Sequence, residues 1–205
     1  VNLGTPDGTD YWSMRRYLSE FLSDRRVIEL TPLLWQPILQ GPILTFRPKK
    51  SGRAYEKVWM EEGSPLLVYT KRQAEKLAAR IGHENLIVDF AMNYGNPSIA
   101  SKIEKLKDEG CDRIAVVALY PQYSATTTAS VYDRTFAALK KMRWQPAVRT
   151  APPFCEHPAY VQALSDSIQQ HISGLDFVPE RVLMSYHGLP KSYLDKGDPY
   201  HCQCY

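Results

Sequence analysis

The sequence predicts an α/β fold in which parallel strands are covered by helices on both faces. From residue 86 onward, apolar runs of strand length alternate with segments of helical length. The apolar runs are rich in Val, Ile and Leu, as strands buried on both faces of a sheet are. With 44% hydrophobic and 23% charged residues, the chain has the composition of a globular protein that can bury a core.

The first half of the chain is predicted to be mainly helical. Thr9 or Asp10 is suited to cap a helix that reaches about Leu22, because apolar residues recur there at helical spacing. Residues 26–46 are strongly apolar, but three prolines and a glycine interrupt them, so we expect short helical pieces. Residues 65–81 carry one apolar face and predict a further helix.

The second half predicts four strands separated by helices. The strands are expected at residues 86–92, 113–120, 146–151 and 181–186, and the helices at residues 97–110, 127–142 and 158–172. The opening residues "VNLG" have the character of the end of another strand, and the last residues have the character of the start of a new element. We therefore expect the sequence to be a fragment of a longer protein.

Charge and cysteine content narrow the class of protein. The formal net charge is only +3, with lysines and arginines interleaved with acids, which argues against a nucleic-acid partner. Four cysteines are too few for a disulfide framework, so reduced thiols in a reducing compartment are expected. No run approaches the ~20 apolar residues of a transmembrane helix, and no secretory signal pattern opens the sequence.

Candidate functional residues follow the predicted strands, because open parallel sheets bind ligands at the carboxyl ends of their strands. These exits share tyrosines, small hydroxyl residues, glycine and proline, and they lie at residues 2–8, 91–97, 119–128 and 185–190. None contains a glycine-rich phosphate loop, which argues against a nucleotide-binding α/β protein. The last exit holds a histidine, His187.

The residues alone leave alternatives open at these exits. His187 could satisfy the backbone of a turn or could carry chemistry, and Tyr94, Tyr120 and Tyr123 could be ordinary aromatic packing residues. The run "HCQC" at residues 201–204 could bind a soft metal, although a single Cys-x-Cys is weak evidence for such a site.

Six motifs in order give the sequence a close resemblance to the ferrochelatase family over essentially its whole length. They are "VNLGTPD" (1–7), "EGSPL" (62–66), "YGNPS" (94–98), "LYPQYSATTTAS" (119–130), "SYHGLP" (185–190) and "GDPY" (197–200). The resemblance implies two Rossmann-like, chelatase-type domains with parallel sheets flanked by helices around a porphyrin cleft. The first domain would occupy residues 1–120, and residues 121–205 would form the first part of a truncated second domain.

The resemblance also implies the reaction. Members of this family insert ferrous iron into a porphyrin such as protoporphyrin IX to form haem, so the expected enzyme is a metal–porphyrin lyase. Iron would be a substrate and no resident cofactor would be required, while an iron–sulfur cluster at Cys202 and Cys204 stays open. The expected partners are porphyrin and ferrous iron, in the cytoplasm, with peripheral membrane contact through residues 28–46. Neither the oligomeric state nor the particular porphyrin is indicated.

The resemblance also implies roles for individual residues at positions that match the motifs of the family. His187 matches the active-site histidine of the family, and a neutral imidazole can either accept a pyrrole proton or ligate iron. Arg47 suits a propionate carboxylate. The residues matching porphyrin-contacting positions are Leu3, Arg47, Tyr55, Ser64, Tyr94, Tyr120, Tyr123, Ser124 and Thr126.

The sequence departs from the family pattern in two ways that affect these expected roles. Asn93 stands where the family commonly has arginine, which removes a fixed positive charge. The essential glutamate of the family belongs to the later half of the second domain, beyond the 205 residues of this sequence. The fragment itself is therefore expected to be inactive, and the alternative is a non-catalytic tetrapyrrole- or metal-binding chain.

Overall fold

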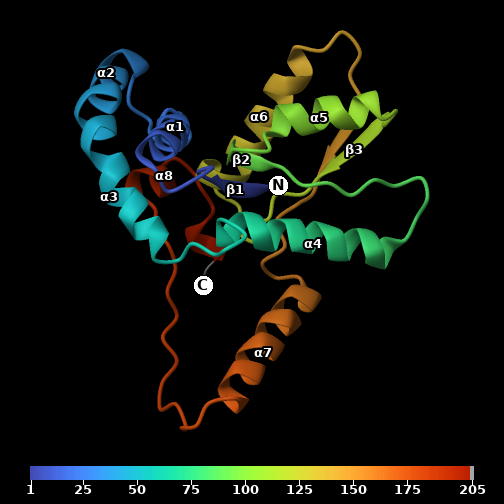
Figure 1. The fold of residues 1–205 in the computed structure, drawn as a ribbon. Coiled ribbons are helices and arrows are strands. Elements are labelled where there is room, and N and C mark those ends of the chain that lie inside the picture. Colours follow the sequence, from blue (N-terminus) through green and yellow to red (C-terminus); the bar gives the residue numbers. More distant parts are fainter. Residues whose placement is uncertain (204–205) are drawn as a thin grey trace. The chain divides into compact units, whose positions relative to one another are not determined.

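The computed structural model describes residues 1–203 and shows an α/β chain in two compact units (Figure 1). The first unit consists of Val1–Leu119 and Ala125–Ala151. The second consists of Tyr120–Ser124 and the described residues from Pro152 onward. Helix α6 and strand β4, which follow the expected domain boundary at residue 120, belong to the first unit.

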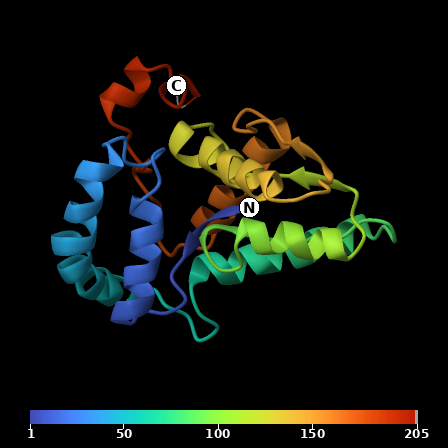
Figure 2. The same cartoon turned by 90° about the horizontal axis from the view of Figure 1, so that it is seen from above.

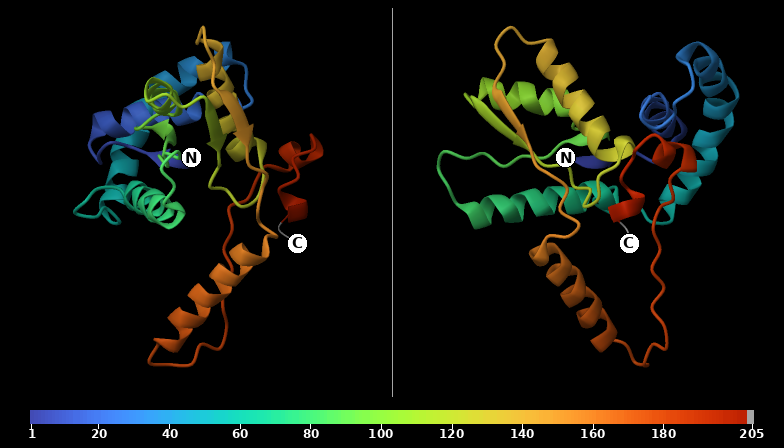
Figure 3. Two further views of the ribbon diagram at one scale, coloured as in Figure 1. Left: turned by 90° about the vertical axis from the view of Figure 1, so that its right-hand side faces the viewer. Right: turned by 180° about the vertical axis from the view of Figure 1, so that it is seen from behind.

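Two pairs of short parallel strands form the centre of the first unit. Strand β1 (Asn2–Thr5) pairs with β2 (Met92–Gly95), and β3 (Arg113–Val116) pairs with β4 (Ala147–Thr150). Figure 3 shows the second pair side by side from two directions. The segment after β3 runs along the start of β1, where the Leu119 amide donates to the Val1 carbonyl oxygen at 2.8 Å. The predicted parallel α/β class is confirmed, with strands shorter than expected.

Helices surround these strands in the first unit (Figure 2). They are α1 (Tyr11–Leu22), α2 (Pro32–Ile38), α3 (Leu44–Glu56), α4 (Pro65–Ile81), α5 (Ile99–Asp108) and α6 (Ser130–Lys140), with π-helical turns η1 (Leu39–Ile43) and η2 (Ala125–Ala129). Asp10 caps α1 as predicted, since its carboxylate accepts from the amides of Trp12 and Ser13. The apolar segment forms α2, η1 and α3 as expected short pieces: Pro37 lies inside α2, and the chain bends at Gly41 (φ −80°, ψ −105°), next to Pro42.

The core of the first unit lies between α1, the start of α3 and β2. Its buried residues are Met14, Tyr17, Leu18, Leu22, Leu39, Leu44 and Tyr94. Gly52 lets α3 approach the start of α1, because a Cβ there would lie 2.3 Å from the Thr9 carbonyl oxygen. This packing fixes α1 against α3 on one side and leaves its far end near β2.

The second unit contains α7 (Pro158–Ser173), α8 (Lys191–Asp195) and the 3₁₀ turn η3 (His201–Gln203). The predicted strand at residues 181–186 is wrong, since residues 181–190 have no regular secondary structure. A strand needs a hydrogen-bonded neighbour, and within the described residues no segment pairs with this one. Leu183 is accordingly 90% exposed, although its apolar character favours burial.

The predicted strand at 86–92 also differs from the structure. Only Met92 of that range lies in a strand, and β2 continues to Gly95 because its register with β1 begins at Asn2 and Met92. Leu86 and Ile87 are half exposed and lie before the paired region. The apolar run therefore leads into the sheet, and the ladder of hydrogen bonds with β1 decides where the strand lies.

Candidate functional site

The carboxyl ends of β1 and β2 meet in the first unit, and two glycines permit their close approach. Gly4 pairs with Tyr94, and Thr5 pairs with Gly95. Gly4 has φ 108°, and a Cβ on it would lie 1.8 Å from the Tyr94 carbonyl oxygen. Gly95 has φ 81°, and a Cβ on it would lie 2.5 Å from the Thr5 carbonyl oxygen. Only glycine meets both the backbone conformation and the steric limit here.

A pocket of about 230 Å³ opens beside these strand ends. It is bounded by the loop after β1, one face of α1 and the loop after β2, and its lining residues are Thr5, Pro6, Asp7, Ser13, Arg16, Tyr17, Glu20, Gly95, Asn96 and Ser98. Asn96 Nδ2 donates to Asp7 Oδ1 at 3.0 Å, which joins the two loops. The pocket therefore lies at the edge of the parallel strands where a ligand is expected.

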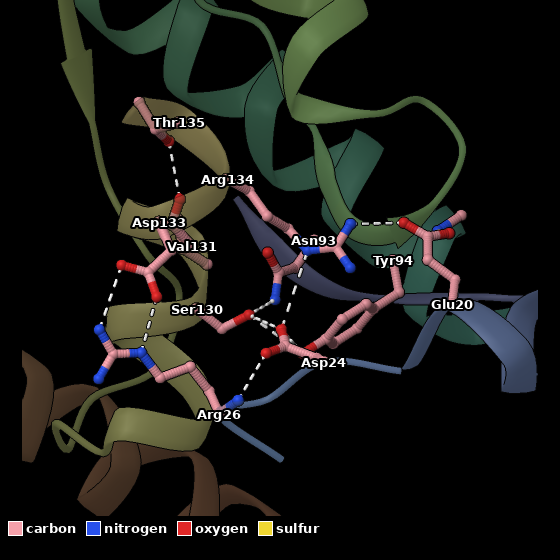
Figure 4. Close-up of polar contacts among 11 residues, drawn as sticks. Glu20, Asp24, Arg26, Asn93, Tyr94, Ser130, Val131, Asp133, Arg134 and Thr135 are labelled. Atoms are coloured by element: carbon pink, nitrogen blue, oxygen red, sulfur yellow. Dashed lines mark hydrogen bonds and ion pairs between the residues drawn. The ribbon is translucent and has the colours of Figure 1, made fainter. Parts of the chain in front are cut away.

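Behind this pocket, Tyr94 is fully buried and anchored through its hydroxyl group. The Tyr94 hydroxyl donates to Asp24 Oδ2 at 2.8 Å, and the Ser130 hydroxyl donates to the same oxygen at 2.5 Å (Figure 4). Burial, together with the nearby Asp24 carboxylate, raises the pKa of the Tyr94 phenol far above its ordinary value. The phenol thus stays protonated and keeps the end of β2 fixed to the end of α1.

Arg134 of α6 completes the same cluster. Its Nη1 donates to Glu20 Oε1 at 2.5 Å, its Nε lies 3.9 Å from Asp24 Oδ2, and its guanidinium lies 4.5 Å from the centre of the Tyr94 ring. The second oxygen of Glu20 accepts from the Gly95 amide at 2.8 Å. Figure 4 shows this cluster, in which one cation faces two carboxylates that both hold β2.

The residues of this cluster other than Tyr94 were not expected from the sequence. Glu20 and Arg134 are 114 positions apart, and Asp24 and Tyr94 are 70 positions apart. A local pattern cannot indicate such pairs, because each member looks like an ordinary surface charge within its own segment.

The other predicted porphyrin residues of the first unit lie in β1, in α3, at the start of α4 and in η2. Leu3 and Tyr55 are half-buried against the core, and Ser64 is buried and accepts from the Thr5 hydroxyl at 2.7 Å. Arg47 is exposed on α3, and Thr126 lies half-buried in η2. Tyr94 is buried from solvent, so the structure gives its ring a packing role, and its contact with porphyrin stays a prediction.

The second unit holds the remaining predicted residues. The Tyr123 amide donates to Gln203 Oε1 at 2.7 Å, and the buried Ser124 hydroxyl donates to Asp198 Oδ2 at 2.9 Å. Tyr120 is half-buried beside them in the chain. These contacts tie residues 120–124 to the segment that carries the "GDPY" motif.

His187 lies exposed in the irregular segment, with Nδ1 2.8 Å from the Gly188 carbonyl oxygen. Because a carbonyl oxygen can only accept, this contact places the ring proton on Nδ1. A neutral His187 then presents Nε2 as a lone-pair donor, which is the form required to take a proton or to bind a divalent metal.

Within residues 1–203, no group of three His, Cys, Asp or Glu side chains could hold a metal ion. Cys202 is exposed, and Cys204, its predicted partner in a cluster, lies outside the described residues. None of the helices in that part of the chain is long and apolar enough to cross a membrane.

Comparison with known proteins decides the family. The family model described as Ferrochelatase matches residues 1–205. The chain belongs to the ferrochelatase family. Ferrochelatases of Agrobacterium fabrum and Rhizobium meliloti are 55% and 58% identical to it, and that of Chelativorans sp. is 59% identical. Each alignment covers 100% of this chain and 59–61% of the relative.

The match to the ferrochelatase family confirms the resemblance carried by the six motifs. The chain spans about 60% of the length of the curated ferrochelatases that it matches. What those longer proteins do is therefore a proposal for the protein to which this chain belongs.

Proposed function

We propose that the complete protein inserts ferrous iron into a porphyrin to form haem, as a metal–porphyrin lyase of haem biosynthesis. The observation that carries this proposal is the identity of 55–59% to ferrochelatases over the whole of this chain. A pocket at the ends of β1 and β2, in a chain with parallel strands, supports it, because ligands of such folds bind at that edge.

Two Rossmann-like domains would hold the porphyrin between them, with residues 1–120 in the first and residues 121–205 in the second. The part of the protein that the chain does not include would complete the second domain. It would also supply the glutamate that the family places opposite the histidine. Iron is a substrate of this reaction, and no resident cofactor is part of the proposal.

The chemistry requires a proton acceptor, because the porphyrin gives up two pyrrole protons as one Fe²⁺ enters the ring. We assign this acceptor role, or alternatively that of an iron ligand, to His187, whose ring offers Nε2 when it is neutral. The exposed guanidinium of Arg47 is free of the core and suits a propionate carboxylate. Leu3, Tyr55 and Ser64 would line the same side of the porphyrin.

Residues 28–46, termed the lip here, suit an apolar substrate. Helix α2 has no buried residue, and Leu33 and Phe46 are 89% and 75% exposed. The inner side of the lip is held to α1, since Tyr11 Oη donates to the Leu44 carbonyl oxygen at 2.9 Å and Trp35 Nε1 to that of Leu22 at 2.7 Å. We propose that its outer apolar face covers the porphyrin and touches the membrane surface, in a protein of the cytoplasm.

The proposal is tested with His187→Ala in the full-length protein. The variant is expected to bind porphyrin with unchanged affinity and to form no metalloporphyrin when ferrous iron is added, as followed by the absorption spectrum. His171→Ala is the matched control, since His171 is an exposed histidine in the last turn of α7 and should not affect turnover. Normal turnover in the His187 variant would refute the assigned role.

For the 205-residue chain alone, we propose binding without catalysis. The irregular backbone at residues 181–190 leaves His187 without a rigid element to hold it. Titration of the chain with porphyrin, with and without ferrous iron, tests this: spectral shifts without metalloporphyrin formation are expected, and haem formation by the chain alone would refute it.

A further inference from the structure

The end of α1 gathers two carboxylates on the side that faces β2. Glu20 lies in the last turn of α1, and Asp24 lies two residues beyond the helix. Carboxylates are unfavourable near a helix C-terminus, where the helix dipole is negative. The Asp24 side chain is also only 12% exposed, so its charge is poorly solvated and needs a nearby cation.

Arg134 is the cation placed to offset both charges. It contacts Glu20 Oε1 directly, lies 3.9 Å from Asp24 Oδ2 and stacks over the Tyr94 ring at 4.5 Å. Asn93, which precedes Tyr94, is buried and donates to Ser130 Oγ at 2.9 Å. A carboxamide carries no charge, so Asn93 could not replace the Arg134 guanidinium. Arg26 binds Asp133 with two nitrogens and so holds α6 at a different point.

Both carboxylates act on the end of β2 through their remaining hydrogen bonds. Asp24 accepts from the Tyr94 hydroxyl, and Glu20 accepts from the Gly95 amide. Gly95 and Glu20 also line the pocket. The charge of Arg134 therefore sets the position of the β2 exit and of one wall of the pocket, without Arg134 lining the pocket itself.

We propose that Arg134 is a positioning residue of the ferrochelatase reaction. It acts through Glu20 and Asp24 to hold the Tyr94–Gly95 exit in the place that the porphyrin requires. The role as a positioning residue for catalysis rests on the proposed function, whereas the effect on the β2 exit does not.

The experiment compares Arg134→Met with Arg26→Met in the full-length protein. Each variant removes an arginine side chain that joins α6 to the end of α1 or to the segment just after it. The Arg26 side chain binds Asp133, and its backbone amide, which donates to Asp24 Oδ1 at 2.7 Å, stays in Arg26→Met, whereas the Arg134 guanidinium binds Glu20 of the cluster around β2. In Arg134→Met the KM for porphyrin should rise about tenfold while kcat changes less than about twofold. The reason is that the variant loses a charge-assisted contact that fixes one wall of the pocket. Arg26→Met should leave both constants within about twofold of wild type.

A hydrogen-exchange measurement and a second variant also test the role of Arg134. Hydrogen exchange at residues 94–98 should become faster in Arg134→Met and stay unchanged in Arg26→Met. If Arg134→Met does not fold, Arg134→Lys replaces it, with an expected rise in KM of about threefold, because lysine keeps the charge and loses the planar fork. Unchanged KM and unchanged exchange in the folded Arg134 variant would overturn the inference.

The wild-type protein distinguishes failure of the proposed function from failure of the inference about Arg134. If wild type forms no metalloporphyrin, the proposed reaction is wrong and the catalytic part of the inference falls with it. The comparison is then made on porphyrin dissociation constants and on exchange at residues 94–98. Equal values for the two variants overturn the positional role as well, and weaker binding with faster exchange in the Arg134 variant upholds it.

Discussion

The Thr5 hydroxyl donates a hydrogen bond of 2.7 Å to Ser64 Oγ, and both side chains are buried. Ser64 occupies the cap position of α4, yet its side chain makes no capping hydrogen bond. The serine hydroxyl instead joins the start of α4 to the end of β1. This pair connects two of the six family motifs, "EGSPL" and "VNLGTPD".

Ser64→Ala should therefore destabilise the fold through the loss of a tertiary contact. The buried Thr5 hydroxyl loses its acceptor, which predicts a decrease of about 1–3 kcal/mol in the free energy of unfolding. Urea denaturation of the full-length protein measures this, with Ser51→Ala as the control, since Ser51 is only half-buried on α3. An equal effect at both positions would contradict the assigned contact.

Gly4→Ala should be among the most damaging single substitutions in the chain. The backbone at Gly4 has φ 108°, and the added Cβ would lie 1.8 Å from a carbonyl oxygen of the paired strand. We expect a loss of more than about 3 kcal/mol of stability, or no folded protein. Gly174→Ala is the control, because a Cβ there meets its neighbours at 3.6 Å or more and the change should be small. A folded Gly4 variant of normal melting temperature would show that the strand ends are farther apart.

Asp89 should contribute to stability against acid. Burial alone would raise its pKa, but hydrogen bonds from Lys102, the Phe90 amide and Lys105 outweigh that effect and place the pKa below its ordinary value of 3.8. A carboxylate with a lowered folded pKa stabilises the fold above its unfolded pKa, and that contribution is lost as pH falls through the folded pKa.

The Asp89→Asn variant tests this in unfolding experiments between neutral pH and about pH 3. Wild type should lose more stability than the variant as the pH falls, because only wild type has this carboxylate to protonate. Asp112→Asn is the control, since the Asp112 side chain is 71% exposed. Parallel curves for wild type and Asp89→Asn would refute the role of Asp89.

The lip should become more ordered when porphyrin binds. Because its outer residues are exposed and its inner side is held to α1, amide exchange over residues 28–46 is expected to slow on addition of porphyrin to the full-length protein. Helix α5, which lies away from the lip in sequence, provides the internal reference. Exchange in the lip that does not change with porphyrin would argue against its role as a cover.

The sequence indicated those features that depend on neighbouring residues. The cap at Asp10, the break at Gly41 and Pro42 and the helix over residues 65–81 all appear as predicted, because each follows from local backbone chemistry. The exits of β1 and β2 were likewise recognised as a candidate site from their residue types.

Features that depend on distant partners could not be predicted in this way. The run at residues 181–186 has the composition of a strand but no neighbour to pair with among the described residues, and composition carries no information about a neighbour. The cluster of Glu20, Asp24 and Arg134 forms only after folding joins segments over 100 positions apart. Tyr94 was indicated by its motif, but its burial depends on distant apolar residues of α1, η1 and the start of α3 that pack around it.

Gly52 has a mechanical consequence for the site. Helix α1 has 12 residues, and at 1.5 Å per residue it is a rod of about 18 Å. One end of this rod is pressed against α3 through the contact of Gly52 with Thr9, and the other end carries Glu20, which holds the Gly95 amide. A displacement of α3 would therefore move α1 and, through Glu20 and the Gly95 amide, the carboxyl end of β2.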